Sequence, residues 1–235
     1  EDYFYMRPLW LLDTIGSRLI QEEQEELVDV LAISSGDGFL QIGIWGHSKT
    51  FTNHLHADEF FLVEQGVIEG VNLVAKFDHL PIKDQVIDVV FLPHTLEQVK
   101  VNQPILNSTT ELLKDGGKLI AIGFNPFSLW GLRHYLSGKR FLLGMNQLIS
   151  VKRYTTWLID LGFRIEKIHY FHATLPTVKR YDLPLKINIF NPFLCACYMI
   201  VANKERIPMT LEKQFTRDGY KQSGSLADSM SRVIE

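Results

Sequence analysis

Residues 87–93, IDVVFLP, decide the fold class of this chain. Apart from Asp88 the run is apolar and rich in β-branched residues, which is typical of a strand buried on both faces of a parallel sheet. A second run of this kind, KLIAIGF at 118–124, follows it, and the segment between them has helical character. Strands that alternate with helices indicate a doubly wound α/β sheet.

Further strands are expected on both sides of this centre. Three precede it, at 39–44, 59–65 and 71–77, and two follow it, at 163–171 and 195–203. We expect the last two to form an antiparallel pair at the sheet edge. The predicted architecture is therefore a doubly wound, mostly parallel, Rossmann-like sheet with an antiparallel edge strand and with helices on both faces.

Helices are predicted at 12–32, 95–114 and 150–161. In the first, apolar residues mark one face, and the run of Gln and Glu residues is expected to cover the other. The apolar face comprises Ile15, Leu19, Leu27 and Leu31. In the second, Pro104 starts a new helix, and the DGG at 115–117 is expected to end it.

Composition limits the class of protein. The chain has 235 residues, 46% of them hydrophobic, and a net charge of −3. One full core is expected, with a helical cap at 1–37, a main domain at 38–203 and a polar tail at 204–235. The net charge argues against nucleic acid as a partner. No apolar run reaches the roughly 18 residues of a membrane helix.

The two cysteines and the N-terminal residues bear on the compartment. Cys195 and Cys197 are too few for a disulfide framework and are predicted to be small buried side chains. The N-terminal residues lack the basic start and small-residue cleavage site of a signal peptide. A reduced, cytoplasmic location is the expectation from these features.

The order of two longer stretches carries a resemblance. HLPIKDQVIDVVFLPHTLE at 79–97, followed by LLKDGGKLIAIGFNP at 112–126, resembles the class I S-adenosylmethionine-dependent methyltransferases. The similarity is to the type 11 group and to a bacterial branch of it, and it extends over about residues 38–202. It implies S-adenosyl-L-methionine as the cofactor and a small molecule as the methyl acceptor.

The resemblance implies a cofactor loop at QIGIWGH, residues 41–47. Gln41 stands where the family has an acid, and Gly43 matches the first glycine of the family pattern. Gly46 lies one place away from the pattern, and Trp45 and His47 occupy the positions of the other two glycines. The sequence therefore predicts a modified cofactor loop, because glycines here let the backbone approach the cofactor.

The remaining cofactor residues are implied at the ends of neighbouring strands. Glu64 matches the acid that accepts hydrogen bonds from the ribose hydroxyl groups. Asp78, with His79 beside it, is the nearest substitute for the adenine-side acid, whose usual position is Lys76. Leu92 and Pro93, at the end of the strand at 87–93, complete the implied set.

The link between the second and third strands is short. Only six residues separate Glu64 from Val71, too few for the usual crossover helix. Either these strands are not both parallel, or the adenine wall is built differently.

His94 follows the strand at 87–93, in the position that faces methyl transfer in the family. Two interpretations are open: a general base that orients the acceptor, or a packing or capping histidine. Glu97, three residues later, fits an acid in the first turn of a helix.

No Asp or Glu occurs from Gly116 to Ile159, although the chain as a whole is acidic. The stretch is basic and aromatic and follows the fifth strand, where the family places acceptor-binding segments. An anionic, amphipathic or lipid-like acceptor, with contact to a membrane surface, is one interpretation. An ordinary solvated helix and loop with a packed aromatic face is the other. The acceptor-side insertion is expected at about 125–150.

Other site types are not favoured. His54, His56 and Asp58 have metal-ligating side chains, but their spacing on a helix separates them, so no metal is expected. GIWGHS does not supply the Gly-rich loop of a nicotinamide-dependent reductase. Two functions remain: a methyltransferase, or a non-catalytic relative that keeps the fold as a binding or scaffold protein.

Overall fold

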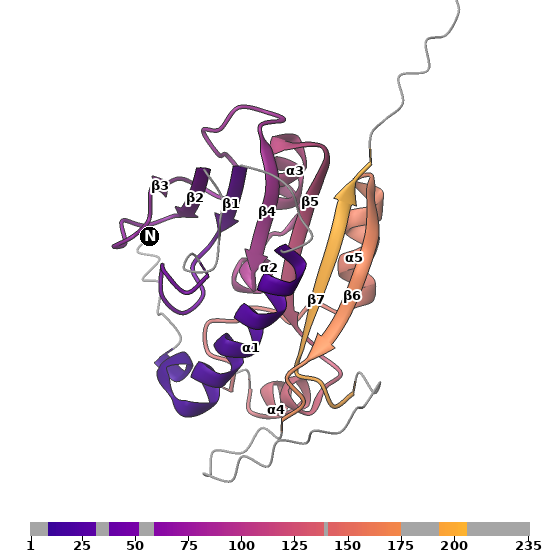
Figure 1. Ribbon diagram of the computed structural model, residues 1–235. Helices are drawn as coiled ribbons and strands as arrows, with labels where there is room; N and C mark the ends of the chain where they lie inside the picture. Colours follow the sequence, from indigo (N-terminus) through magenta and orange to yellow (C-terminus); the bar gives the residue numbers. More distant parts are fainter. Residues whose placement is uncertain (1–8, 32–37, 52–58, 139–140, 175–192, 206–235) are drawn as a thin grey trace, which may run out of the picture.

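A computed structural model describes residues 9–31, 38–51, 59–138, 141–174 and 193–205. Seven strands form one sheet in the order β3-β2-β1-β4-β5-β7-β6 (Figure 1). The strands are β1 (Gly38–Ile42), β2 (Glu59–Glu64), β3 (Leu73–Val74), β4 (Ile87–Pro93), β5 (Leu113–Phe124), β6 (Phe163–Phe171) and β7 (Cys197–Lys204).

The sheet is mostly parallel, as the sequence predicts. The pairs β1–β2, β1–β4, β2–β3 and β4–β5 are parallel, while β7 runs antiparallel to both β5 and β6. β1 therefore lies beside β4 rather than β3, and the strand order reverses between them. In doubly wound sheets, ligands bind outside the carboxyl ends of the strands at such a switch point.

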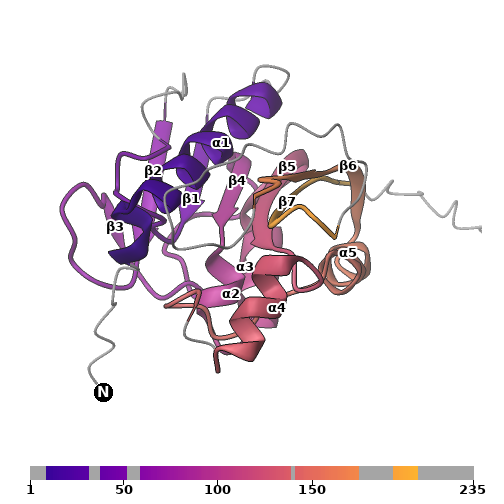
Figure 2. The ribbon, with the colours of Figure 1, turned by 90° about the horizontal axis from the view of Figure 1, so that it is seen from below.

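Helices cover both faces of the sheet (Figure 2). A 3₁₀ turn, η1 (Leu9–Leu12), and α1 (Thr14–Leu31) pack on one face. The other face carries α2 (Thr95–Gln98), α3 (Gln103–Leu112) and α5 (Val151–Asp160), while α4 (Leu129–Leu136) follows β5 beyond its carboxyl end. Two apolar cores result: Leu19, Phe39 and Phe91 belong to the first, and Leu40, Val90 and Leu106 to the second.

The short link between β2 and β3 joins parallel strands without a helix. β3 comprises only Leu73–Val74, less than the strand expected at 71–77. The Asn72 side chain takes the place of further backbone pairing, because its amide donates to the Phe60 carbonyl and its carbonyl accepts from Leu62 N–H. A strand of two residues needs no full crossover to return to the sheet.

The expected stop at 115–117 is wrong. β5 begins at Leu113 and runs through this glycine pair, and its register with β4 shifts between Ile87 and Val89. Gly116 adopts a φ of 80° there, so the glycines permit an irregular stretch of strand instead of ending a helix. The restart at Pro104 is confirmed, because α3 begins with Pro104 in its first turn.

Several expectations lie outside the described residues. They are the segment with His54, His56 and Asp58 and nearly all of the polar tail. Among the described residues, no helix is long and apolar enough to span a membrane. Cys195 and Cys197 are both buried free thiols, as expected.

Candidate functional site

The loop after β1 is tied to the end of β2 by two backbone donors. Gly43 N–H donates to the Val63 carbonyl at 2.9 Å, and Ile44 N–H donates to Glu64 Oε2 at 3.0 Å. The other carboxylate oxygen accepts from Gln65 N–H at 2.8 Å. The Glu64 side chain is fully buried, so the predicted loop and the predicted ribose-binding acid lie in direct contact.

The backbone conformation at position 43 and the close packing around it favour glycine. Its φ is 85°, a region that side chains disfavour, and a Cβ here would lie 3.2 Å from Thr95 Oγ1 and 3.7 Å from the Phe77 ring. The loop thus packs against the start of α2 on one side and the residues before Asp78 on the other. Gly46 is the second glycine with positive φ, at 76°.

Gln41 lies at the end of β1, fully buried. Its Nε2 donates to the Gly43 carbonyl at 2.9 Å, which orients the amide. Its Oε1 is buried and has no hydrogen-bond partner among the described residues. A buried acceptor without a donor is costly, by about 1–3 kcal/mol, so this oxygen points to a donor supplied by a ligand.

The remaining predicted cofactor residues lie in two different environments. Leu92 and Pro93 are buried at the end of β4, beside the buried loop. Asp78 and His79 are exposed, and their side chains approach to 3.6 Å. Phe77 is buried against Gly43, so this segment does border the loop.

His94 is enclosed at the carboxyl end of β4. It has a φ of 54°, is fully buried, and its ring contacts those of Trp45 and Phe124, each at a centroid separation of 4.3 Å. Its Nδ1 contacts Glu97 Oε2 at 2.8 Å, and its Nε2 contacts Glu23 Oε1 at 2.9 Å. Both ring nitrogens are therefore engaged by carboxylates.

The charge of this cluster follows from its surroundings. Burial alone would lower the pKa of His94, but attraction by Glu23 and the hydrogen bonds to both carboxylates outweigh it and raise the pKa to about 9. Burial raises the pKa of Glu97, against hydrogen bonds from His94, Phe124 N–H and Ile149 N–H. These contacts favour the imidazolium form of His94 at neutral pH.

Glu23 is the residue that the sequence analysis missed. Its carboxylate also accepts from Trp45 Nε1 at 2.8 Å, and its side chain is 0% exposed. The expectation that all the glutamates of this helix cover a polar face is therefore wrong. The signal was present, because Glu23 lies four residues after Leu19 and four before Leu27, on the apolar stripe itself.

Cys197 lies beside this cluster. Its thiol and the donor atoms of Glu23 and His94 lie within 4.8 Å of one another. Such residue types can bind a transition metal, but the two carboxylates already occupy both nitrogens of His94. Burial raises the pKa of Cys197 well above its usual value, so the thiol is protonated. The geometry is that of a hydrogen-bonded ion cluster.

Beyond β5 the surface is apolar and basic. Five large apolar side chains are exposed there: Phe127, Leu132, Tyr135, Leu136 and Leu143. A pocket lined by Leu129, Leu132, Arg133, Leu136 and Ser137 runs along α4. The Arg133 guanidinium lies 4.2 Å from the centroid of the Phe141 ring.

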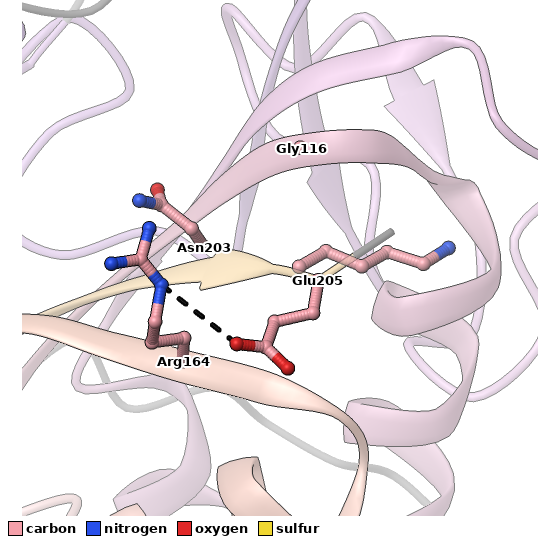
Figure 3. Close-up of a pocket in the computed structure, with 5 residues that line it drawn as sticks. Gly116, Arg164, Asn203 and Glu205 are labelled. Carbon is pink, nitrogen blue, oxygen red and sulfur yellow. Dashed lines mark ion pairs between the residues drawn. The ribbon is translucent and has the colours of Figure 1, made fainter. Parts of the chain in front are cut away.

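A second pocket lies at the opposite edge of the sheet (Figure 3). It is lined by Gly116, Arg164, Asn203, Lys204 and Glu205, near the start of β5 and β6 and the end of β7. Arg164 and Glu205 form an exposed ion pair of 3.8 Å across it. This edge is remote from the carboxyl ends where ligands of doubly wound sheets bind.

Comparison with known proteins gives one family model and one curated relative. A family model named Methyltransferase domain matches residues 52–121. The chain is 35% identical over 134 residues to an uncharacterized protein, YafS, of Escherichia coli K12. That match covers 57% of this chain and 55% of the relative, so the chain spans little more than half the length of the curated protein that it matches.

Solved structures agree with the fold. An S-adenosylmethionine-dependent methyltransferase from Thermotoga maritima matches with a TM-score of 0.63 and 18% identity, covering 83% of this chain and 93% of that one. Another, from Archaeoglobus fulgidus, gives 0.61 and 18%, covering 86% and 100%. Geranyl diphosphate C-methyltransferase from Streptomyces coelicolor gives 0.55 and 15%, covering 80% of each chain. The resemblance expected from the sequence is thus confirmed, and the chain has the class I S-adenosylmethionine-dependent methyltransferase fold.

Proposed function

We propose that this chain is an S-adenosylmethionine-dependent methyltransferase whose cofactor binds at the carboxyl ends of β1, β2 and β4. The observation that carries the proposal is the contact of the loop after β1 with Glu64, at the switch point of a methyltransferase-like sheet. The match of residues 52–121 to a methyltransferase domain supports it.

The residues present fit this cofactor. Gln41 Oε1 is a buried acceptor without a partner, and the cofactor carries an ammonium group that can donate to it. The Glu64 carboxylate accepts from Ile44 and Gln65 and is oriented by them, which presets it for ribose hydroxyl groups. Gly43 and Gly46 allow the positive φ angles of the loop, 85° and 76°, that bring Ile44 N–H to Glu64.

The bound cofactor supplies an activated methyl group on a sulfonium. The protein's part is then to hold cofactor and acceptor in line, because orientation accounts for much of such a rate enhancement. Asp78, with His79 beside it, would contact the adenine of the cofactor. Leu92 and Pro93 would provide the apolar surface of the site at the end of β4.

His94 fixes the positions of the residues that surround the site. Its two nitrogens contact Glu23 and Glu97, and its ring contacts Trp45 and Phe124. Of the two interpretations of His94, we therefore propose the packing one, with a role in positioning the ends of β4 and β5.

The acceptor is proposed to be a small anionic and amphipathic molecule. The surface of α4 offers exposed Leu132 and Leu136 beside Arg133, and no acidic residue occurs between Gly116 and Ile159. A fold neighbour, the Streptomyces coelicolor enzyme, methylates geranyl diphosphate, which combines a charged and an apolar part. A membrane surface that presents such an acceptor would suit the same face.

The chain is proposed to work as one main domain at 38–203, with the N-terminal helix as a cap and the segment at about 125–150 as the acceptor side. Native mass spectrometry of the freshly purified protein tests the proposed function. We expect a mass increment equal to S-adenosylmethionine or its demethylated product, S-adenosylhomocysteine. A bare protein mass that also gains nothing when either compound is added in excess would remove the proposal.

A further inference from the structure

Three glutamates of α1 each pair with a histidine that lies in a strand or directly after one. Glu22 lies 3.0 Å from His172, Glu23 lies 2.9 Å from His94, and Glu26 lies 2.5 Å from His169. The Glu23–His94 pair differs from the other two because both of its side chains are fully buried. The other two pairs retain solvent exposure on the glutamate or the histidine.

The buried pair is one link in a longer chain of hydrogen bonds. Trp45 Nε1 donates to Glu23, Glu23 contacts His94, and His94 contacts Glu97. Glu97 in turn accepts from Phe124 N–H at 3.0 Å and from Ile149 N–H at 3.4 Å. One continuous network thus joins the loop after β1, the end of β4, the end of β5 and the segment that precedes α5.

The charged groups of the network are enclosed, and one histidine faces two carboxyl groups. The ionisable groups that face His94 and its partners from other elements are Cys197 and Tyr198 of β7 and Tyr154 of α5. Burial raises the pKa of each of these three well above its usual value, so they are neutral. The imidazolium of His94 is therefore held by the two carboxylates alone.

We propose that Glu23, His94 and Glu97 are positioning residues that lock the cofactor loop to the acceptor-facing ends of β4 and β5. The N-terminal helix α1 would then be part of the site, because it supplies the carboxylate that holds both Trp45 and His94. This inference rests on the proposed function for the identity of the ligand. It adds that the loop geometry depends on a helix outside the matched domain at 52–121.

The test compares two substitutions on one helix. Glu23→Gln removes the buried charge, and Glu26→Gln makes the same chemical change at a peripheral pair. Titration calorimetry with S-adenosylhomocysteine at neutral pH is expected to give an affinity at least about tenfold weaker for Glu23→Gln and within about twofold of the unmodified protein for Glu26→Gln. Equal affinities in the two variants would overturn the proposal.

A spectroscopic measurement serves as the second readout. The ring of His94 lies 4.3 Å from that of Trp45, and a protonated imidazole in contact with an indole quenches its fluorescence. We expect tryptophan emission of the unmodified protein to rise between pH 8 and pH 10, and this rise to be absent in Trp45→Phe and shifted to lower pH in Glu23→Gln. A rise that is the same in all three proteins, or absent from the unmodified one, would overturn the proposal.

These two readouts separate failure of the network from failure of the proposed function. If the unmodified protein binds neither S-adenosylmethionine nor S-adenosylhomocysteine, the proposed function fails, and the fluorescence titration alone then decides on the network. If Glu23→Gln does not fold, Glu97→Gln replaces it, since it removes the second carboxylate of His94. If neither variant folds, the titration of the unmodified protein against Trp45→Phe decides.

Discussion

Ile44 N–H donates a hydrogen bond of 3.0 Å to Glu64 Oε2, so the loop after β1 and the carboxylate at the end of β2 form one unit. The two residues lie twenty positions apart in the sequence, and the parallel pairing of β1 with β2 brings them together. This contact fixes the Glu64 carboxylate at the carboxyl edge of the sheet.

Substitution of Gly43 by alanine should destabilise the protein. The residue has a φ of 85°, and a Cβ would lie 3.2 Å from Thr95 Oγ1. Strain of this kind costs about 1–3 kcal/mol. Gly66 is the matched control, because a Cβ there meets nothing within 4 Å, and its replacement by alanine should change stability by less than about 0.5 kcal/mol. Urea unfolding measures both, and equal losses would contradict the account of the loop.

Removal of the Asp78 carboxylate should weaken cofactor binding without affecting the fold. The residue is exposed and lies next to Phe77, which packs against Gly43. Loss of one hydrogen bond to the adenine corresponds to an affinity about three- to tenfold lower. We expect this for Asp78→Ala in calorimetry with S-adenosylhomocysteine, and no change for Asp84→Ala, an exposed acid of the following loop. An unchanged affinity in Asp78→Ala would show that the adenine side is built from other residues.

Stability should fall at alkaline pH because His94 loses its proton. The folded pKa is raised from 6.5 to about 9, so the stabilisation is fully present below pH 6.5 and is lost as the pH rises through 9. A shift of this size corresponds to at most about 3 kcal/mol. Tyr154, Cys197 and Tyr198 also have raised pKa values, so their own losses of stability begin at their ordinary pKa values, 9.0 for the cysteine and 10.0 for the tyrosines, and are shared by the variants compared.

Urea unfolding between pH 7 and pH 10 measures this dependence. Other surface groups also titrate, so the comparison is with Glu23→Gln, in which the folded pKa of His94 falls, so that the decline should end at a lower pH and be smaller in total. Glu26→Gln should follow the unmodified protein. Parallel curves for all three proteins would rule out a charged His94 in the core.

Polar substitution on α4 should impair acceptor binding and leave stability unchanged. Leu136 is 78% exposed, so Leu136→Ser should change the free energy of unfolding by less than about 0.5 kcal/mol. With geranyl diphosphate as an anionic amphipathic probe and S-adenosylhomocysteine present, we expect weaker binding in calorimetry for this variant. Ile159→Ser, on α5 and 59% exposed, is the matched control and should bind the probe normally. Identical binding by both variants would exclude α4 as the acceptor surface.

Much of the fold follows from local pattern. β4 has the bounds that its apolar run predicts, and Pro104 begins α3 as expected, because both signals act on the residues that carry them. β3 is shorter and β5 longer than predicted, for a physical reason. The Asn72 side chain substitutes for strand pairing at β3, and neighbouring strands hold the glycines 116 and 117 extended in β5, which tertiary context decides.

The sequence predicts individual residues of the candidate site but not the contacts between them. The motif resemblance singled out Gly43 and Glu64, and in the structure Ile44, the residue after Gly43, donates to Glu64. Glu23 was assigned to a solvated face because glutamates are rarely buried without a partner, and its partners His94 and Trp45 come from distant parts of the chain. Pairings across 71 and 22 positions are set by the sheet topology and not by local sequence.

Glu64, held by the loop after β1, is proposed to bind the cofactor. Titration calorimetry of S-adenosylhomocysteine into the unmodified protein and into Glu64→Gln tests it most directly, with Glu69→Gln as an exposed control. We predict micromolar binding by the unmodified protein and by Glu69→Gln, and a loss of roughly ten- to hundredfold in Glu64→Gln, because hydrogen bonds to a charged group are worth about 1.5–3 kcal/mol. No heat of binding with the unmodified protein, or an undiminished affinity in a folded Glu64→Gln, would contradict it.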